Sequence, residues 1–476
     1  MSPTYFYSDL EVLKALFGPE NALCLIYNPK QRLILNLPEE VVAFQERTVL
    51  IQYLAKRRED HFILFNMAGE DLLDLYGQSQ ILTIVRFGHQ KEEKRQPALY
   101  YTINNPDGSI RWIVPSDNKY PGFLNLYNAN TLKAKAFRHL AKQLFQRGVP
   151  HLLASGSFVF FHKGPHPIER YLADFSNQEY TIFTGTIGLN RKAIIELGQN
   201  GQSTHFIKWP VSPKSLSLVQ QEEQAIRRTS QLGIRGLSLP RIRTLGKALL
   251  QSNVKNGQQY SADHLSAVHM QLLLRAYEHS EETSPLTALA SYREIGERLT
   301  RLKNGHLLLN GMNPEYTGQL IDRMDQHYQA IDADTLVSFA WAHGDFTPWN
   351  MYLSKEGVAL YDLELSRMDM PLLYDAFHFI FQSAILIHRY GYSRIRSQLR
   401  ALANMPEVQK MVDQYQLDID LHLRFYLLYN ISYYLEQYIQ QIRLHAQVHW
   451  LVDVWLETLR SIELQSTSTE KRSINY

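Results

Sequence analysis

The stretch AHGDFTPWN at residues 342–350 decides how this sequence is interpreted, because one short loop combines a carboxylate, an amide and a stiffening proline. Phosphoryl transfer needs a carboxylate that orients the attacking hydroxyl and accepts its proton, and it needs oxygen ligands that hold magnesium on the phosphates. Asp345 can serve as that carboxylate, and Asn350 can serve as one of the metal ligands. Pro348 restricts the backbone between them. The stretch therefore predicts a phosphoryl-transfer site.

The residues that follow this loop predict a β-hairpin with apolar arms at 351–353 and 358–361. Such a hairpin would bring Asn350 and Asp362 together at its open end, where paired Cα atoms lie roughly 4.5–5.5 Å apart. Both side chains can then converge on one ion. Asp362 is therefore the predicted principal metal ligand.

These features resemble the aminoglycoside phosphotransferase and choline kinase family, which is related to the protein kinases. The resemblance covers residues 179–455 and is most specific at residues 343–350, at the triplet DLE of residues 362–364 and at DMPLLYD of residues 369–375. It implies a protein-kinase-like α+β fold with a small β-rich nucleotide lobe and a larger helical lobe.

The resemblance also implies a role for each residue of the motifs. Asp345 matches the catalytic aspartate, and Asn350 and Asp362 match the magnesium ligands. Asp375 matches a structural aspartate that braces the loop. His343 belongs to the catalytic loop, where it would hold the loop in place rather than carry protons.

The block upstream then corresponds to the nucleotide lobe. Lys208 lies on a predicted strand, where such a lobe places the lysine that pairs with ATP phosphates. Its carboxylate partner is expected on the following helix, residues 215–230, where Glu222 and Glu223 both qualify. Glu223 is preferred because it shares one helical face with several apolar side chains. Without the downstream motif, this pair would be read as an ordinary surface ion pair.

The expected glycine loop, GTIGLN at residues 185–190, departs from the protein-kinase pattern. It offers Gly185 and Gly188 where protein kinases have three glycines, so its backbone amides would approach the phosphates less closely. A hairpin should follow, with arms at 192–197 and 204–209 around Asn200-Gly201, a dipeptide that suits a tight turn.

The first 150 residues predict a separate α/β domain, because short apolar runs alternate with helical patterns. No glycine-rich dinucleotide or phosphate loop follows any run, so the region resembles a Rossmann-type fold without its glycine loop. We expect it to position an acceptor or partner and to perform no chemistry. The predicted strands are 22–27, 33–35, 61–66, 81–87, 99–103 and 109–114, and the predicted helices are 48–57 and 70–76.

Length and composition limit the remaining possibilities. Because single cores stop growing near roughly 250–300 residues, a chain of 476 residues needs at least two domains. We expect the accessory domain at 1–150, the nucleotide lobe at 151–255, the helical lobe at 256–464 and a disordered tail at 465–476.

Charge, cysteine content and hydropathy predict the surroundings of the protein. A net charge of +2 gives no global attraction to nucleic acid. The single cysteine, Cys24, excludes an intramolecular disulfide and indicates a reducing compartment. No secretory signal is visible, and no apolar run reaches the ~18 residues of a membrane span. A cytoplasmic protein without a transmembrane segment is expected.

The sequence thus predicts an ATP- and Mg²⁺-dependent phosphotransferase that acts on a hydroxyl of a small molecule, such as a sugar or an amino alcohol. The alternative is a catalytically inactive kinase-like scaffold, and protein kinase activity is disfavoured because Asp362-Leu363-Glu364 replaces Asp-Phe-Gly. The oligomeric state, the acceptor and the choice between ATP and GTP stay open. Five tyrosines can line an acceptor site, although a tyrosine-rich core is the commoner explanation; they are Tyr426, Tyr429, Tyr433, Tyr434 and Tyr438.

Overall fold

The computed structural model divides the chain into two compact units. The first comprises Met1–Gln220 and Arg241–Asn253, and the second comprises Gln221–Pro240 and Val254–Tyr476. The described residues are 3–19, 21–29, 41–57, 60–67, 72, 75, 81–88, 99–125, 132–163, 167–175, 177–188, 190–255, 264–304, 314–355, 357–439 and 446–462. The predicted strand at 33–35, most of the predicted helix at 70–76 and the predicted tail lie outside them.

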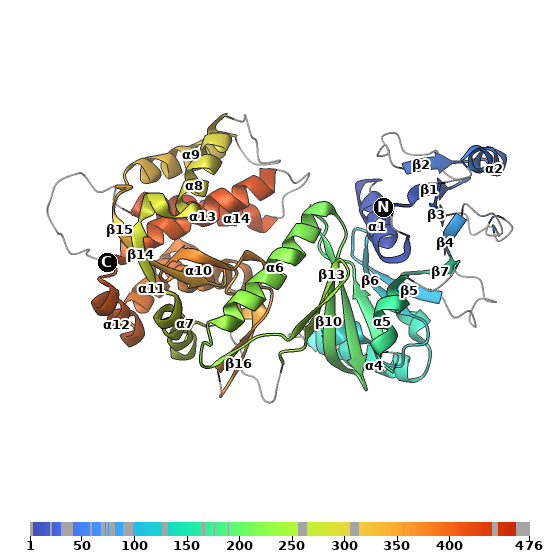
Figure 1. Ribbon diagram of the computed structural model, residues 1–476, viewed down its shortest axis with the longest axis horizontal. Coiled ribbons are helices and arrows are strands. Elements are labelled where there is room, and N and C mark those ends of the chain that lie inside the picture. Colours follow the sequence, from blue (N-terminus) through green and yellow to red (C-terminus); the bar gives the residue numbers. More distant parts are fainter. Residues whose placement is uncertain are drawn as a thin grey trace. The chain divides into compact units, whose positions relative to one another are not determined.

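The described strands of the first unit form one sheet of twelve strands (Figure 1). Its order is β12-β13-β10-β9-β8-β6-β5-β7-β4-β3-β1-β2. Four neighbours at one end are parallel, namely β1 (Leu23–Tyr27), β2 (Val41–Phe44), β3 (Phe62–Asn66) and β4 (Ile81–Phe87). The antiparallel strands are β5 (Leu99–Asn104), β6 (Ile110–Pro115), β7 (Gly156–His162), β8 (Glu179–Phe183), β9 (Lys192–Gln199), β10 (Gln202–Pro210), β12 (Ile242–Leu245) and β13 (Ala248–Ser252).

The parallel strands are apolar on both faces because helices cover both of them, as parallel sheets require. Leu10, Leu13 and Phe17 of α1 (Pro3–Phe17) share a core with one face, whereas Leu50 and Leu54 of α2 (Arg47–Lys56) share a core with the other. This arrangement confirms the predicted α/β character of the N-terminal region. The remaining helices of this unit are α4 (Leu132–Gln146), α5 (Pro167–Leu172) and the first part of α6 (Pro213–Gln231).

The domain boundary expected at residue 150 does not divide this sheet. Strand β7, which lies just beyond that expected boundary, pairs with β4 and β5 of the N-terminal region. Strand β8 of the lobe pairs with β6. The strands expected in the nucleotide lobe therefore continue the sheet of the N-terminal region, because edge strands of each part hydrogen-bond to strands of the other. The observed units divide at Gln220, Pro240 and Asn253.

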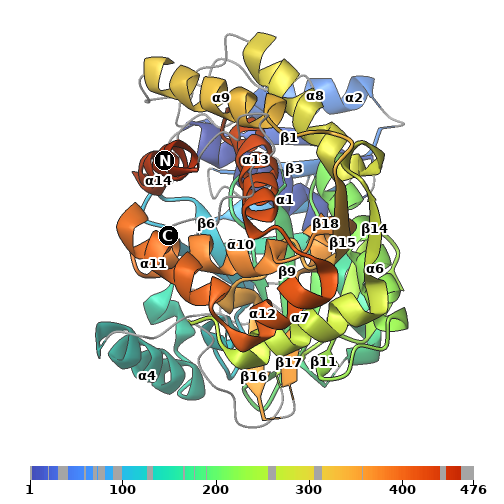
Figure 2. The ribbon, with the colours of Figure 1, turned by 90° about the vertical axis from the view of Figure 1, so that its left-hand side faces the viewer.

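The second unit is mainly helical and also contains two three-stranded sheets. Helix α13 packs against α8, α10 and α14 (Figure 2). The helices are α7 (Ala267–Ser280), α8 (Ala290–Asn304), α9 (Pro314–Gln329), α10 (Tyr374–Gln382), α11 (Tyr392–Ala403), α12 (Pro406–Tyr415), α13 (Ile419–Ile439) and α14 (Ala446–Ser461); the strands are β11 (Leu237–Ser238), β14 (Glu282–Pro285), β15 (Leu336–Ala342), β16 (Met351–Ser354), β17 (Gly357–Leu360) and β18 (Arg367–Pro371).

The β-rich block followed by a helical block confirms the fold class expected from the sequence, apart from the merging of the sheets. Within the described helices, none is long and apolar enough to cross a membrane.

Candidate active site

The predicted catalytic loop follows β15 and is fixed by Asp375 in the first turn of α10. The Asp375 carboxylate accepts the backbone N–H groups of His343 at 2.7 Å and of Gly344 at 3.0 Å. Gly344 has φ of +84°, and a Cβ there would lie 2.2 Å from the carbonyl oxygen of Leu365, so only glycine fits. Burial raises the pKa of Asp375, and the neighbouring His343 and the two N–H bonds oppose that rise. Asp375 thereby braces the loop.

His343 is fully buried and contacts backbone groups through both ring nitrogens. Its Nδ1 accepts the N–H of Asp345 at 3.2 Å, and its Nε2 lies 3.0 Å from the carbonyl oxygen of Tyr361. This pattern assigns the proton to Nε2, which donates to Tyr361. Because neither nitrogen faces solvent, His343 links the loop to the β16–β17 hairpin and has no free atom for proton exchange with a substrate.

Two donors hold the carboxylate of Asp345. Its Oδ1 accepts from Nε2 of His378 at 3.0 Å, and its Oδ2 accepts from Nδ2 of Asn350 at 2.8 Å. The side chain of Asp345 is still 23% exposed, so a substrate can reach it. The Asn350 amide nitrogen also bonds to the Asp345 backbone oxygen at 3.1 Å. That use of the nitrogen leaves the Asn350 amide oxygen as its available ligand atom.

The sequence interpretation missed His378. Its side chain is 1% exposed, and its ring stacks parallel to Tyr374 and meets the edge of Tyr426. A signal was present, because His378 follows Asp375 by about one helical turn and so lies on the same face of α10. That face reaches the catalytic loop only through the tertiary packing of α10.

The predicted hairpin forms, with Met351 opposite Leu360, and the N–H of Tyr361 donates to the Asn350 carbonyl at 3.1 Å. Asp362 follows directly in the left-handed region, with φ of +66°. Carboxylate oxygens of Glu222, Asp362 and Glu364 all lie within 4.8 Å of one another. Oxygen donors of this kind are the ligands that magnesium prefers.

Helix α6 presents Glu222, and not Glu223, to this carboxylate cluster. Glu222 is fully buried, whereas the side chain of Glu223 is 20% exposed and accepts a hydrogen bond from Nη2 of Arg227 at 2.8 Å. Buried positions 219, 222, 226 and 229 follow the helical spacing of three and four, so the inward stripe passes through Glu222. Glu222 thus belongs to the carboxylate cluster, whereas the preference for Glu223 as the partner of Lys208 stays a prediction.

Lys208, Gly185 and Gly188 lie in the first unit, whereas Glu223, the other predicted nucleotide residue, lies in the second. Lys208 is 7% exposed and stands on β10 opposite Ile194 of β9 and Leu249 of β13. Gly185 and Gly188 both have positive φ, +79° and +157°. Since Lys208 and Glu222 belong to different units, their pairing stays a prediction.

The tyrosines of α13 divide into two groups. Tyr426 and Tyr429 are buried in the core, as the commoner explanation expected, whereas Tyr433, Tyr434 and Tyr438 are half-buried. Burial raises the pKa of Tyr434 well above its ordinary value, and the charge of Asp345 adds to the shift. Asp345 acts on the pKa of Tyr426 and Tyr433 in the same direction. The charge of Asp345 thus acts on all three phenols.

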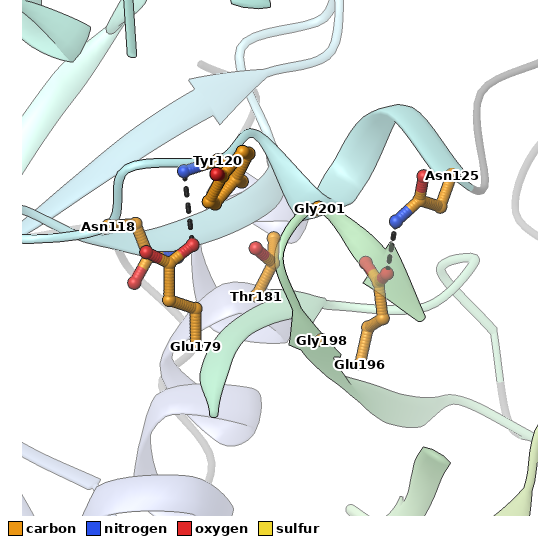
Figure 3. A pocket seen from close by; sticks show the side chains of 9 residues that line it. Asn118, Tyr120, Asn125, Glu179, Thr181, Glu196, Gly198 and Gly201 are labelled. Atoms are coloured by element: carbon orange, nitrogen blue, oxygen red, sulfur yellow. Dashed lines mark hydrogen bonds between the residues drawn. The ribbon is translucent and has the colours of Figure 1, made fainter. Parts of the chain in front are cut away.

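Two hollows in the first unit lie apart from all predicted site residues. One holds about 10 Å³, room for a single water molecule, and contains Glu196, whose Oε1 accepts from Asn125 at 2.7 Å (Figure 3). The other is a mainly apolar cavity of about 290 Å³ bordered by Asp9, Thr102 and Phe87. Neither hollow includes a residue of the loop at 342–350.

No protein-family model and no curated protein matches this chain. Solved structures do match it in part. An ADP-bound aminoglycoside phosphotransferase, APH(2'')-Ib, is 11% identical over 61% of this chain and 96% of its own, with a TM-score of 0.39. Choline kinase LicA from Streptococcus pneumoniae is 12% identical over 62% of this chain and 98% of its own, with a TM-score of 0.39.

A putative fructosamine-3-kinase from Haemophilus somnus is 13% identical over 61% of this chain and 96% of its own, with a TM-score of 0.37. The similarity to aminoglycoside phosphotransferases and choline kinases that the sequence predicted is thus found among solved structures. At such identities and TM-scores, the activity of this chain has to be argued from its own residues.

Proposed function

We propose that this chain is an ATP- and magnesium-dependent phosphotransferase that phosphorylates a hydroxyl of a small molecule. The observation that carries the proposal is the state of Asp345, a partly exposed carboxylate held by two donors. A candidate base needs this combination of fixed geometry and access to the hydroxyl that it deprotonates. The hairpin that begins beside Asn350 also leads into Asp362 and Glu364, which supports phosphoryl transfer over other acid–base chemistry.

In the proposed reaction, Asp345 accepts the hydrogen bond of the acceptor hydroxyl, orients its oxygen toward the phosphorus and takes its proton. His378 and Asn350 hold the two carboxylate oxygens, which limits rotation of the base. His343 and Asp375 fix the backbone that carries it. Fixed orientation is the main protein contribution to such a transfer.

The donor set fits a divalent cation. Asp362, Glu364 and the amide oxygen of Asn350 would hold magnesium, which supplies charge neutralisation on the phosphate oxygens when bound. Lys208 would contact the ATP phosphates. The loop containing Gly185 and Gly188 would present backbone N–H groups to the same phosphates.

For the acceptor we propose a small hydroxylated molecule such as a sugar or an amino alcohol. The half-buried Tyr433 and Tyr434, whose pKa the charge of Asp345 helps to raise, support this choice, because aromatic faces with a phenol at one edge suit both sugars and quaternary ammonium groups.

The test combines nucleotide binding with turnover. Calorimetry of ATP, with and without Mg²⁺, should show magnesium-dependent binding to the parent protein and to Asp345→Asn. Turnover should fall by roughly 10²–10⁴ in Asp345→Asn, the range for loss of a positioned base. Asp362→Ala should lose the magnesium dependence, because the ion loses an anionic ligand. Glu297→Gln, which changes an exposed carboxylate of α8 in the same unit, serves as the matched control.

Turnover is followed as ADP release with choline, glucosamine and glycerol as acceptors, and GTP is tested alongside ATP. A parent protein that binds no nucleotide in the presence of magnesium would contradict the proposal and favour the inactive scaffold. Unchanged turnover in Asp345→Asn would exclude Asp345 as the base.

A further inference from the structure

The base of the predicted glycine loop is closed by tight backbone packing. Strand β8 ends at Phe183 and β9 begins at Lys192. A Cβ at Gly185 would lie only 2.1 Å from the carbonyl oxygen of Lys192, so the two ends of the loop approach as closely as glycine allows. A group that holds these two ends therefore restricts the conformations open to the loop.

Arg191 ties the two ends together. Its Nε donates to the backbone oxygen of Thr184 at 2.8 Å, so the residue that follows the loop is bonded to the residue that precedes it. The N–H of Thr184 donates to the backbone carbonyl oxygen of Arg111 at 3.0 Å, and the hydroxyl of Thr184 donates to the carbonyl oxygen of Ile110 at 2.6 Å. The loop is thereby attached to the beginning of β6.

The N-terminal helix α1 completes this arrangement through Asp9. One carboxylate oxygen of Asp9 accepts from Nη2 of Arg191 at 3.1 Å, and the other accepts the N–H of Ile110 at 2.7 Å. Both charged side chains are 4% exposed. Burial raises the pKa of Asp9 and lowers the pKa of Arg191, and each partner opposes the shift of the other. A pair buried this deeply holds its geometry, because separating the charges would leave each one unsolvated.

We propose that Asp9 and Arg191 are positioning residues for the nucleotide-binding loop, so that the N-terminal helix is part of the nucleotide machinery. This inference rests on the proposed function. It assigns to the N-terminal region a task other than the acceptor positioning expected from the sequence. When the pair is intact, the loop amides are already ordered before ATP arrives, and binding does not have to order them.

The test replaces the pair by apolar side chains of similar size, in the double variant Asp9→Leu/Arg191→Met, which leaves no lone buried charge. We expect the dissociation constant for Mg·ATP to rise roughly 10- to 100-fold, the cost of ordering a few freed groups on binding. The KM for ATP should rise with it, while kcat at saturating ATP stays unchanged. Arg191→Lys, which keeps the positive charge beside Asp9 but loses the planar fork that reaches both Thr184 and Asp9, should show a smaller increase and covers the case in which the double variant does not fold.

Arg243→Met is the matched control, because Arg243 forms an exposed ion pair with Asp174 in the same unit. Its nucleotide affinity should equal that of the parent. Amide hydrogen exchange of residues 184–188 without nucleotide gives a readout that does not depend on activity, and exchange there should accelerate in the double variant only.

The outcomes separate the two proposals. A folded double variant with parental affinity and parental exchange overturns the positioning role, whatever the reaction is. A parent protein without nucleotide affinity overturns the proposed function and, with it, the role in nucleotide binding. The exchange result then still decides whether the pair orders the loop.

Discussion

Replacement of Asp375 gives the most direct test of how the catalytic loop is held. The Asp375→Ala variant removes both acceptor oxygens while leaving a helix-compatible side chain in the first turn of α10. The N–H groups of His343 and Gly344 then lose their partners in a buried place. Each buried N–H without a partner costs about 1–3 kcal/mol, so the two together cost about 2–6 kcal/mol.

Part of that cost is offset, because burial raises the pKa of Asp375 and removal of the carboxylate relieves its desolvation. We therefore expect a loss of about 2–4 kcal/mol in the free energy of unfolding, the lower half of this range. Asp375→Asn keeps one carbonyl oxygen and should lose about 1–3 kcal/mol, since only one N–H is left without a partner.

Urea unfolding followed by fluorescence measures the free energy, and amide exchange at His343 and Gly344 reports the loop itself. Asp413→Ala on α12 is the matched control, because this exposed aspartate lies in a helix of the same unit. Its effect should stay within about 0.5 kcal/mol. If Asp375→Ala unfolded like the control and both amides kept their protection, the bracing role derived from the structure would be refuted.

Three further predictions follow from the contacts described above. His378→Phe keeps an aromatic ring but removes the hydrogen-bond donor to Asp345, so turnover should fall roughly 10- to 100-fold at unchanged KM for ATP, which corresponds to one hydrogen bond to a charged group. His378→Gln should recover part of the lost turnover. Equal rates in the two variants would contradict the role of His378 as a donor to Asp345. Burial raises the pKa of Glu196 in the folded protein above its value in the unfolded chain. The contribution of Glu196 to stability is therefore fully present below the pKa of the unfolded chain, and it is lost as the pH rises through the pKa of the folded protein. Glu196→Gln should therefore gain stability relative to the parent from pH 5 to pH 9, and parallel unfolding curves would argue against a buried neutral carboxyl. A fragment of residues 158–476 lacks β4, β5 and β6, which are the partners of β7 and β8. The unpaired edges of β7 and β8 should cause this fragment to aggregate. A soluble fragment that binds nucleotide would show that the continuous sheet is dispensable.

Much of the local structure could be predicted from the sequence because it depends on neighbouring residues. The hairpin around Asn200-Gly201 forms where both residues take positive φ, +53° and +76°, as its turn type requires. The apolar arms around residues 354–357 pair as expected. The motif at 342–350 likewise brought Asp345 and Asn350 within hydrogen-bond distance, since only four residues separate them.

Only the tertiary structure decided which distant side chains meet. The sequence placed His378 on a helix, but its contact with Asp345 depends on how α10 packs beneath the loop. Which glutamate of α6 joins Asp362 and Glu364 depended on which stripe of that helix became buried.

The ion pair between Asp9 and Arg191 joins residues separated by most of the first unit, and no local pattern announces it. The continuity of the twelve-stranded sheet across residue 150 likewise depends on pairing between strands that are far apart in the sequence. Periodicity along a sequence fixes which face of a helix or strand is apolar, because that depends on backbone geometry. It does not fix the partner of that face, because the partner is selected by packing between segments that are remote in the chain.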